Sequence, residues 1–299
     1  EEVYFKLAET AEEAGRSIEA ARAYEAIAYE RLGSPYLRPA RLALARLDAS
    51  GRARSRFLAP AESLQYAGRL LRNGHAPDAL EVLSGIQAGA LTGQAALDAA
   101  YLRVSCLSAL RENAGAVAEA DALWEAAGPH PTAVQAQLRA GWALLRIPDR
   151  QGIARRVDRV LQHAGTDEAT RAEAYLLLGT AAYAEGQWDD ASLAFRSQEG
   201  LKGDGGTQAS GLYKRACSEF MRGNYSGARS LFHRTAQRYH QEGYRQPALY
   251  WAARCSLLTG DLEAGFRDLR VLASAPPGCW RSTRGSSWTS CFGGSSPGT

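Results

Sequence analysis

Apolar side chains recur at helical spacing on both sides of a glycine in three similar stretches of the chain. These stretches cover residues 175–195, 213–232 and 250–269. Their glycines, Gly186, Gly223 and Gly260, follow one another at intervals of 37 residues (223 − 186 and 260 − 223). Glycine readily takes the left-handed backbone conformation that ends a helix. The pattern therefore predicts a helix–turn–helix hairpin that repeats every 37 residues.

The side chains that follow each glycine also repeat. An aromatic residue or a leucine comes two positions later, at Trp188, Tyr225 and Leu262. A small residue follows at Ala191, Ala228 and Ala264 or Gly265, and then a large one at Phe195, Phe232 and Leu269. The small residue lets two helices approach closely, and the large one fills the space between hairpins. These positions resemble the tetratricopeptide pattern, in which Gly179 and Ala216 would be the small residues of the first helix.

The first half of the chain repeats this scheme less regularly. We expect turns at Gly15, Gly74 and Gly115, and a further helix that ends at Gly51. No stretch shows the alternation of apolar and polar residues that is typical of a strand. The sequence therefore predicts an all-α fold, an α-solenoid of about seven tetratricopeptide-like helix hairpins over residues 1–278.

The last part of the sequence, residues 279–299, differs from everything before it. It contains no Ala, Leu, Val, Ile, Asp or Glu, although the preceding chain is rich in alanine and leucine. Such a Ser/Gly-rich composition cannot supply a packed core, so we expect a disordered tail outside the repeat domain. A shift of reading frame near Gly278 is one hypothesis for the change, and a natural tail is the other.

Composition and charge exclude two classes of partner. The net charge is +3, from 35 Lys+Arg and 32 Asp+Glu, and the positive charges are scattered, so we expect no nucleic-acid partner. No apolar run is long enough for a transmembrane segment. Cys106, Cys217 and Cys255 occur in apolar helical patterns, where a cysteine acts as a small apolar side chain.

The sequence does not contain the motifs of the common cofactor and metal sites. None of its lysines, Lys6, Lys202 and Lys214, follows a glycine as in a phosphate-binding loop. Its five histidines include no pair four residues apart, and neither histidine nor cysteine clusters with metal-ligand spacing. We therefore expect no cofactor, no metal and no catalytic residue.

Aromatic residues are the best candidates for binding. In a tetratricopeptide superhelix the first helix of each hairpin lines the concave face, and this pattern predicts a groove lined by Tyr183, Tyr213, Phe220, Tyr250 and Arg254. Aromatic rings beside an arginine suit contact with a peptide or a glycan. Packing between the hairpins is the other role open to the same side chains.

Residues 233–278, and ALYWAARCSLLTGD within them, resemble the helical region of the soluble lytic murein transglycosylases. The resemblance implies a periplasmic α-superhelix that holds peptidoglycan strands. The catalytic domain of that family carries the motifs E-S-x-F, G-L-M-Q and A-Y-N-A-G. Here Glu62 and Ser63 are followed by Leu64, and the only methionine, Met221, lies in EFMRG. Glu62 is therefore interpreted as a residue at a helix start.

Two functions follow from these observations. The first is a non-catalytic scaffold that binds peptidoglycan strands or cell-envelope proteins in the periplasm. The alternative is a tetratricopeptide adaptor that binds extended protein segments, and that could equally belong to the cytoplasm.

Overall fold

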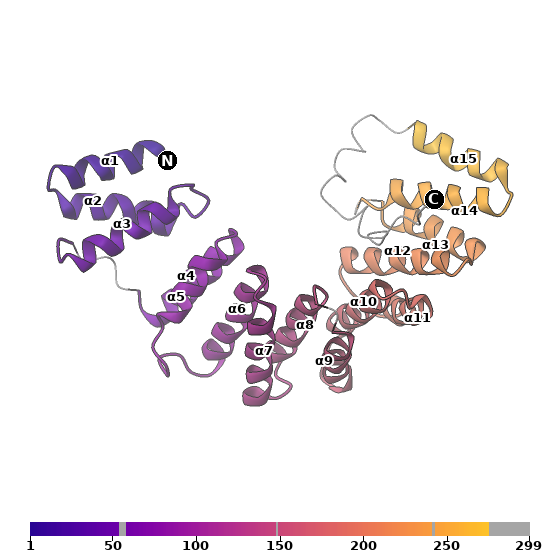
Figure 1. Cartoon of the computed structure of the whole chain (residues 1–299), viewed down its shortest axis with the longest axis horizontal. Coiled ribbons are helices and arrows are strands. Elements are labelled where there is room, and N and C mark those ends of the chain that lie inside the picture. The colour runs from indigo at the N-terminus through magenta and orange to yellow at the C-terminus, as the bar shows by residue number, and fades with distance from the viewer. Residues whose placement is uncertain (54–57, 148, 241–242, 275–299) are drawn as a thin grey trace. The chain divides into compact units, whose positions relative to one another are not determined.

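The computed structural model describes residues 1–53, 58–147, 149–240 and 243–274 (Figure 1). These residues form fifteen α-helices and one π-helical turn, with no strand among them, so the predicted all-α fold is confirmed. The chain divides into two compact units, Glu1–Ala143 and a second unit that begins at Leu144. The proposed tail, its hypothetical frame shift and the boundary at 278 lie outside the described residues.

The helices run in chain order through each unit (Figure 1). The first helices are α1 (Glu2–Glu13), α2 (Ser17–Glu25) with its π-helical continuation (Ala26–Glu30), α3 (Leu37–Ala49), α4 (Pro60–Arg72), α5 (Ala76–Ser84), α6 (Gln94–Ala109), α7 (Asn113–Ala127) and α8 (Pro131–Leu144). The later helices are α9 (Arg150–Gln162), α10 (Glu168–Ala184), α11 (Trp188–Glu199), α12 (Gly205–Met221), α13 (Tyr225–Arg238), α14 (Arg245–Leu258) and α15 (Leu262–Ala273).

Six pairs of helices are joined by the same tight turn. At its centre is a residue with φ between 63° and 85°: Gly15, Gly74, Arg111, Gly186, Gly223 and Gly260. The N–H of the next residue donates to the carbonyl five positions earlier, at 2.8 to 3.0 Å in all six turns. This Schellman arrangement satisfies carbonyl groups that the ending helix leaves without partners.

The turn predicted at Gly115 is wrong, because the residue in the left-handed conformation is Arg111 (φ 63°). Gly115 lies inside α7 instead, next to Leu107. With Arg111 as the reference, Ala116 falls five residues after the turn, where the other hairpins have their small residue. The turns at Gly74 and Arg111 are then also 37 residues apart (111 − 74). The left-handed glycine predicted after α3, Gly51, is present with φ 67°.

The small positions are where the two helices of a hairpin touch. Five residues after the turn, Ala191 and Ala228 have no exposed surface. Seven residues before it, Gly179 packs against Phe195, which lies nine residues after the same turn. A Cβ atom at residue 179 would be only 2.5 Å from Phe195 Cε1. Phe195 is itself fully buried, so the ring has little room to move.

We expect Gly179→Ala to destabilise the second unit by about 1–3 kcal/mol, because the new methyl group overpacks the contact with Phe195. Urea unfolding followed by circular dichroism measures this change. Gly200→Ala is the matched control, since residue 200 has φ −82° and open space around it. Equal stabilities of the two variants would contradict the close contact.

We expect Arg111→Gly to stabilise the first unit by about 1 kcal/mol. An L-residue in the left-handed region costs roughly 1–2 kcal/mol, and the extra freedom of glycine in the unfolded chain offsets part of the gain. The reverse change, Gly223→Ala at φ 79°, should destabilise the second unit by a similar amount. Thermal unfolding of both variants checks the two signs, and a lower melting temperature for Arg111→Gly would contradict the assignment of the turn.

Candidate functional site

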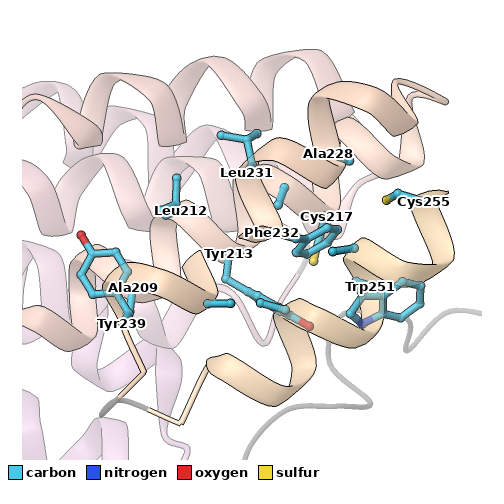
Figure 2. Packing of buried hydrophobic residues seen from close by; sticks show 14 residues of the cluster. Ala209, Leu212, Tyr213, Cys217, Ala228, Leu231, Phe232, Tyr239, Trp251 and Cys255 are labelled. Atoms are coloured by element: carbon cyan, nitrogen blue, oxygen red, sulfur yellow. The ribbon is translucent and has the colours of Figure 1, made fainter. Parts of the chain in front are cut away.

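An aromatic core holds α12, α13 and α14 together in the second unit (Figure 2). Phe232 of α13 contacts Tyr213 of α12, with ring centroids 5.6 Å apart, and Trp251 of α14, at 6.5 Å. Cys217 and Cys255 pack in the same cluster. Burial raises the pKa of the Cys255 thiol to about 12, so this cysteine serves as an apolar side chain, as its sequence pattern predicts.

The 37-residue repeat places equivalent side chains at matching positions on α10, α12 and α14. The rows that it produces are Leu176, Tyr213 and Tyr250; Thr180, Cys217 and Arg254; Tyr183, Phe220 and Leu257; and Ala184, Met221 and Leu258. Exposure increases towards the C-terminal end of each helix and is greatest on α14. The side chains accessible to a partner are therefore concentrated near the ends of α12 and α14.

The five predicted groove residues occupy different environments. Tyr213 is only 8% exposed and packs against Phe232 and Tyr244. Tyr183 is half-buried against Trp188 of its own hairpin, with ring centroids 4.8 Å apart. Tyr183 and Tyr213 therefore make packing contacts, which is the alternative role that the sequence allows for these side chains.

The remaining three, Phe220, Tyr250 and Arg254, come together around Trp251. The rings of Phe220 and Tyr250 lie 5.2 and 5.5 Å from the Trp251 ring, and both residues keep part of their surface exposed. Arg254 is exposed, with its guanidinium carbon 4.7 Å from the Trp251 centroid and 5.9 Å from that of Phe220. Both distances allow a cation–π interaction.

Arg254 forms no ion pair with any carboxylate of the described residues. The rings hold its guanidinium group in place through its face, while its N–H groups can bind an acceptor from another molecule. Two exposed apolar residues lie nearby in the sequence of these helices: Leu257, one turn after Arg254 on α14, and Met221, which follows Phe220 on α12. Their exposures are 37% and 38%.

We define the α12–α14 surface as Phe220, Met221, Tyr250, Arg254 and Leu257. The sequence interpretation did not include Met221, Leu257 or the supporting Trp251. The 37-residue interval could have found Leu257, because it relates this residue to the predicted groove residue Phe220.

A buried polar network fixes the end of α12 beside this surface. Glu219 is 7% exposed and accepts hydrogen bonds from Ser192 Oγ (2.5 Å) of the preceding hairpin and from Asn224 Nδ2 (2.8 Å). Arg222 donates to the same carboxylate and also pairs with Asp189 at 2.6 Å. Burial opposes ionisation of Glu219, but the hydrogen bonds and the charge of Arg222 outweigh it, so the pKa of this carboxyl is lowered.

We expect Glu219→Gln to destabilise the second unit by about 1–2 kcal/mol at pH 7, because the charge-assisted hydrogen bonds are lost. The folded-state pKa of Glu219 lies below its ordinary value of 4.5. The stabilisation is therefore complete above about pH 5 and disappears as the pH falls through the folded-state pKa.

Urea unfolding of the wild type and Glu219→Gln between pH 7 and pH 3 measures this dependence. The difference in unfolding free energy should be constant at high pH and shrink below pH 4.5. Glu263→Gln is the control, because Glu263 belongs to an exposed ion pair with Arg267 and should have little effect. A difference that does not change with pH would contradict the role of the Glu219 charge.

Other sequence assignments can be placed in the structure. Glu62 lies in the first turn of α4 and accepts a hydrogen bond from the Ala59 N–H at 3.0 Å, as expected for a residue at a helix start. Over the described ranges, no group of three or more His, Cys, Asp or Glu side chains could hold a metal ion. None of the helices described has both the length and the apolar character needed to cross a bilayer.

Comparison with known proteins supports the fold. The structure is similar to a tetratricopeptide repeat protein from Parabacteroides merdae, with a TM-score of 0.50 and 13% sequence identity over 93% of each chain. At this identity the likeness establishes a tetratricopeptide-like helical repeat fold and nothing about ligands. No family model and no curated protein matches the sequence. The resemblance to the lytic transglycosylases stays a prediction from the sequence.

Proposed function

We propose that this protein is a helical-repeat scaffold that binds an extended segment of a protein partner through the α12–α14 surface. The observation that carries the proposal is Arg254, an exposed cation held over Trp251, with the exposed Leu257 one turn later on the same helix. A buried aromatic anchor with an arginine on it is the composition found at energetically important points of protein interfaces.

The chemistry of the surface defines the partner. Arg254 favours a carboxylate, because a guanidinium group can donate two parallel hydrogen bonds to it. Met221 and Leu257 favour an aliphatic or aromatic side chain, and methionine adapts its shape to different apolar groups. The expected partner is thus a peptide segment in which acidic and large apolar residues alternate.

A peptidoglycan strand in the periplasm is the competing ligand, because the sequence resembles the transglycosylase helical region. Glycans stack on broad exposed aromatic faces. In the α12–α14 surface the rings are partly covered by one another, and the most exposed apolar groups are aliphatic. These features favour the peptide.

A binding experiment separates the two ligands. Fluorescence polarisation with a labelled set of ten-residue peptides, acidic–apolar against basic–apolar, should detect binding of the acidic set alone. Arg254→Ala should weaken that binding at least tenfold, and Leu257→Ser should weaken it several-fold.

Arg238→Ala is the matched control, because Arg238 is also an exposed arginine whose guanidinium lies over a ring, that of Tyr239 at 5.4 Å. It should bind as the wild type does. If the protein co-sediments with purified peptidoglycan and binds none of the peptides, the ligand is a glycan strand and the proposed protein partner is wrong. Equal affinities of Arg254→Ala and Arg238→Ala would contradict the proposed surface.

A further inference from the structure

A concave site lies between α13, α14 and α15, and none of its lining residues belongs to the α12–α14 surface. Its volume is about 390 Å³, within the range of sites for small ligands. We call it the α13–α15 pocket, and its lining residues are His233, Ala236, Gln237, His240, Arg245, Leu249 and Val271.

Among the described residues, the polar lining of this pocket consists of hydrogen-bond donors and includes no carboxylate. Arg245, His240 and Gln237 are exposed, and none of their side chains forms a hydrogen bond or ion pair with another described residue. His233 Nε2 lies 3.1 Å from Asp268 Oδ2 of α15. Asp268 is 8% exposed and does not line the pocket.

The remaining wall is apolar. Ala236, Leu249 and Val271 come from three different helices and supply aliphatic surface beside the donors. A bare inorganic anion would leave this wall without a contact. A ligand with a negative group and an attached apolar group would satisfy both parts of the pocket.

We propose that the α13–α15 pocket binds a carboxylate carried on an apolar group. Arg245 supplies the paired N–H donors that match a carboxylate. His240 and Gln237 supply further donors, and Leu249 and Val271 contact the apolar group. Such a ligand can be a free small organic acid or the C-terminal residue of a peptide, and the two share the same recognition chemistry.

N-acetyl-L-leucine is a probe with both features, and N-acetyl-L-leucinamide is its neutral counterpart. Titration of the full chain at pH 7, followed by the NMR signals of the histidine rings, should show saturable binding of the acid with shifts of the His233 and His240 signals. The amide and inorganic phosphate should leave these signals unchanged. A leucine-ending peptide, compared with its amidated form, tells the two sources apart. Binding of the peptide indicates a chain terminus, and binding of the small acid alone indicates a free organic acid.

Arg245→Gln should weaken the binding of N-acetyl-L-leucine at least fivefold, and His240→Ala should weaken it by a smaller factor. Both residues are exposed, so the fold should be unchanged, and a thermal melt verifies this. Arg196→Gln, an exposed arginine on α11 outside the pocket, should bind as the wild type does. The proposal is overturned if no probe binds, if the amide or phosphate binds as well as the acid, or if Arg245→Gln and Arg196→Gln behave alike.

Discussion

The two helices of a hairpin approach each other at buried positions that carry mostly small side chains, and the rest of the unit is arranged around this contact. Seven residues before the turn the first helix has a small residue in five of the six hairpins, Ala8, Ala67, Gly179, Ala216 and Ala253, and a valine, Val104, in the sixth, all of them buried. In the hairpin of α10 and α11 the space is so limited that the Phe195 ring occupies the place of a Cβ atom on Gly179. The turn fixes the register of the two helices and so sets which residues face each other in the hairpin.

Because the register within the hairpin is fixed, side chains at the same repeat position have equivalent places in successive hairpins, but they differ in whether they are buried or exposed. Tyr213 and Tyr250 are one repeat apart, yet the first is buried among Phe232 and Tyr244 and the second keeps part of its ring exposed. Similarly, Cys217 is 1% exposed, whereas Arg254 in the equivalent position must direct its charge to solvent. The repeat provides a framework of equivalent positions, and the residue type decides whether a position packs or is available to a ligand.

Local sequence patterns predicted the parts of this structure that depend on neighbouring residues. Glycine followed by a helix start identified five of the six turns, and the small and large positions around Gly186 and Gly223 were correctly assigned. The sixth turn was missed because Arg111 adopts a backbone conformation that favours glycine. The sequence prediction therefore placed this turn at the nearby Gly115. Contacts between residues far apart in sequence left no such signal. The bond from Ser192 to Glu219 and the pairing of His233 with Asp268 depend on how successive hairpins stack.

The same reasoning explains why two of the five predicted groove residues, Tyr183 and Tyr213, make packing contacts instead. A periodic aromatic pattern identifies one face of a helix, but it does not show whether the next hairpin covers that face. At Tyr213 the neighbouring rings cover this face, whereas on α14 Arg254 stays exposed beside Trp251 and Phe220. An arginine in a repeat position that elsewhere holds Thr180 or Cys217 cannot be buried without a partner charge. Such a substitution of residue type within a repeat therefore distinguishes a binding position from a packing position more clearly than the aromatic residues themselves do.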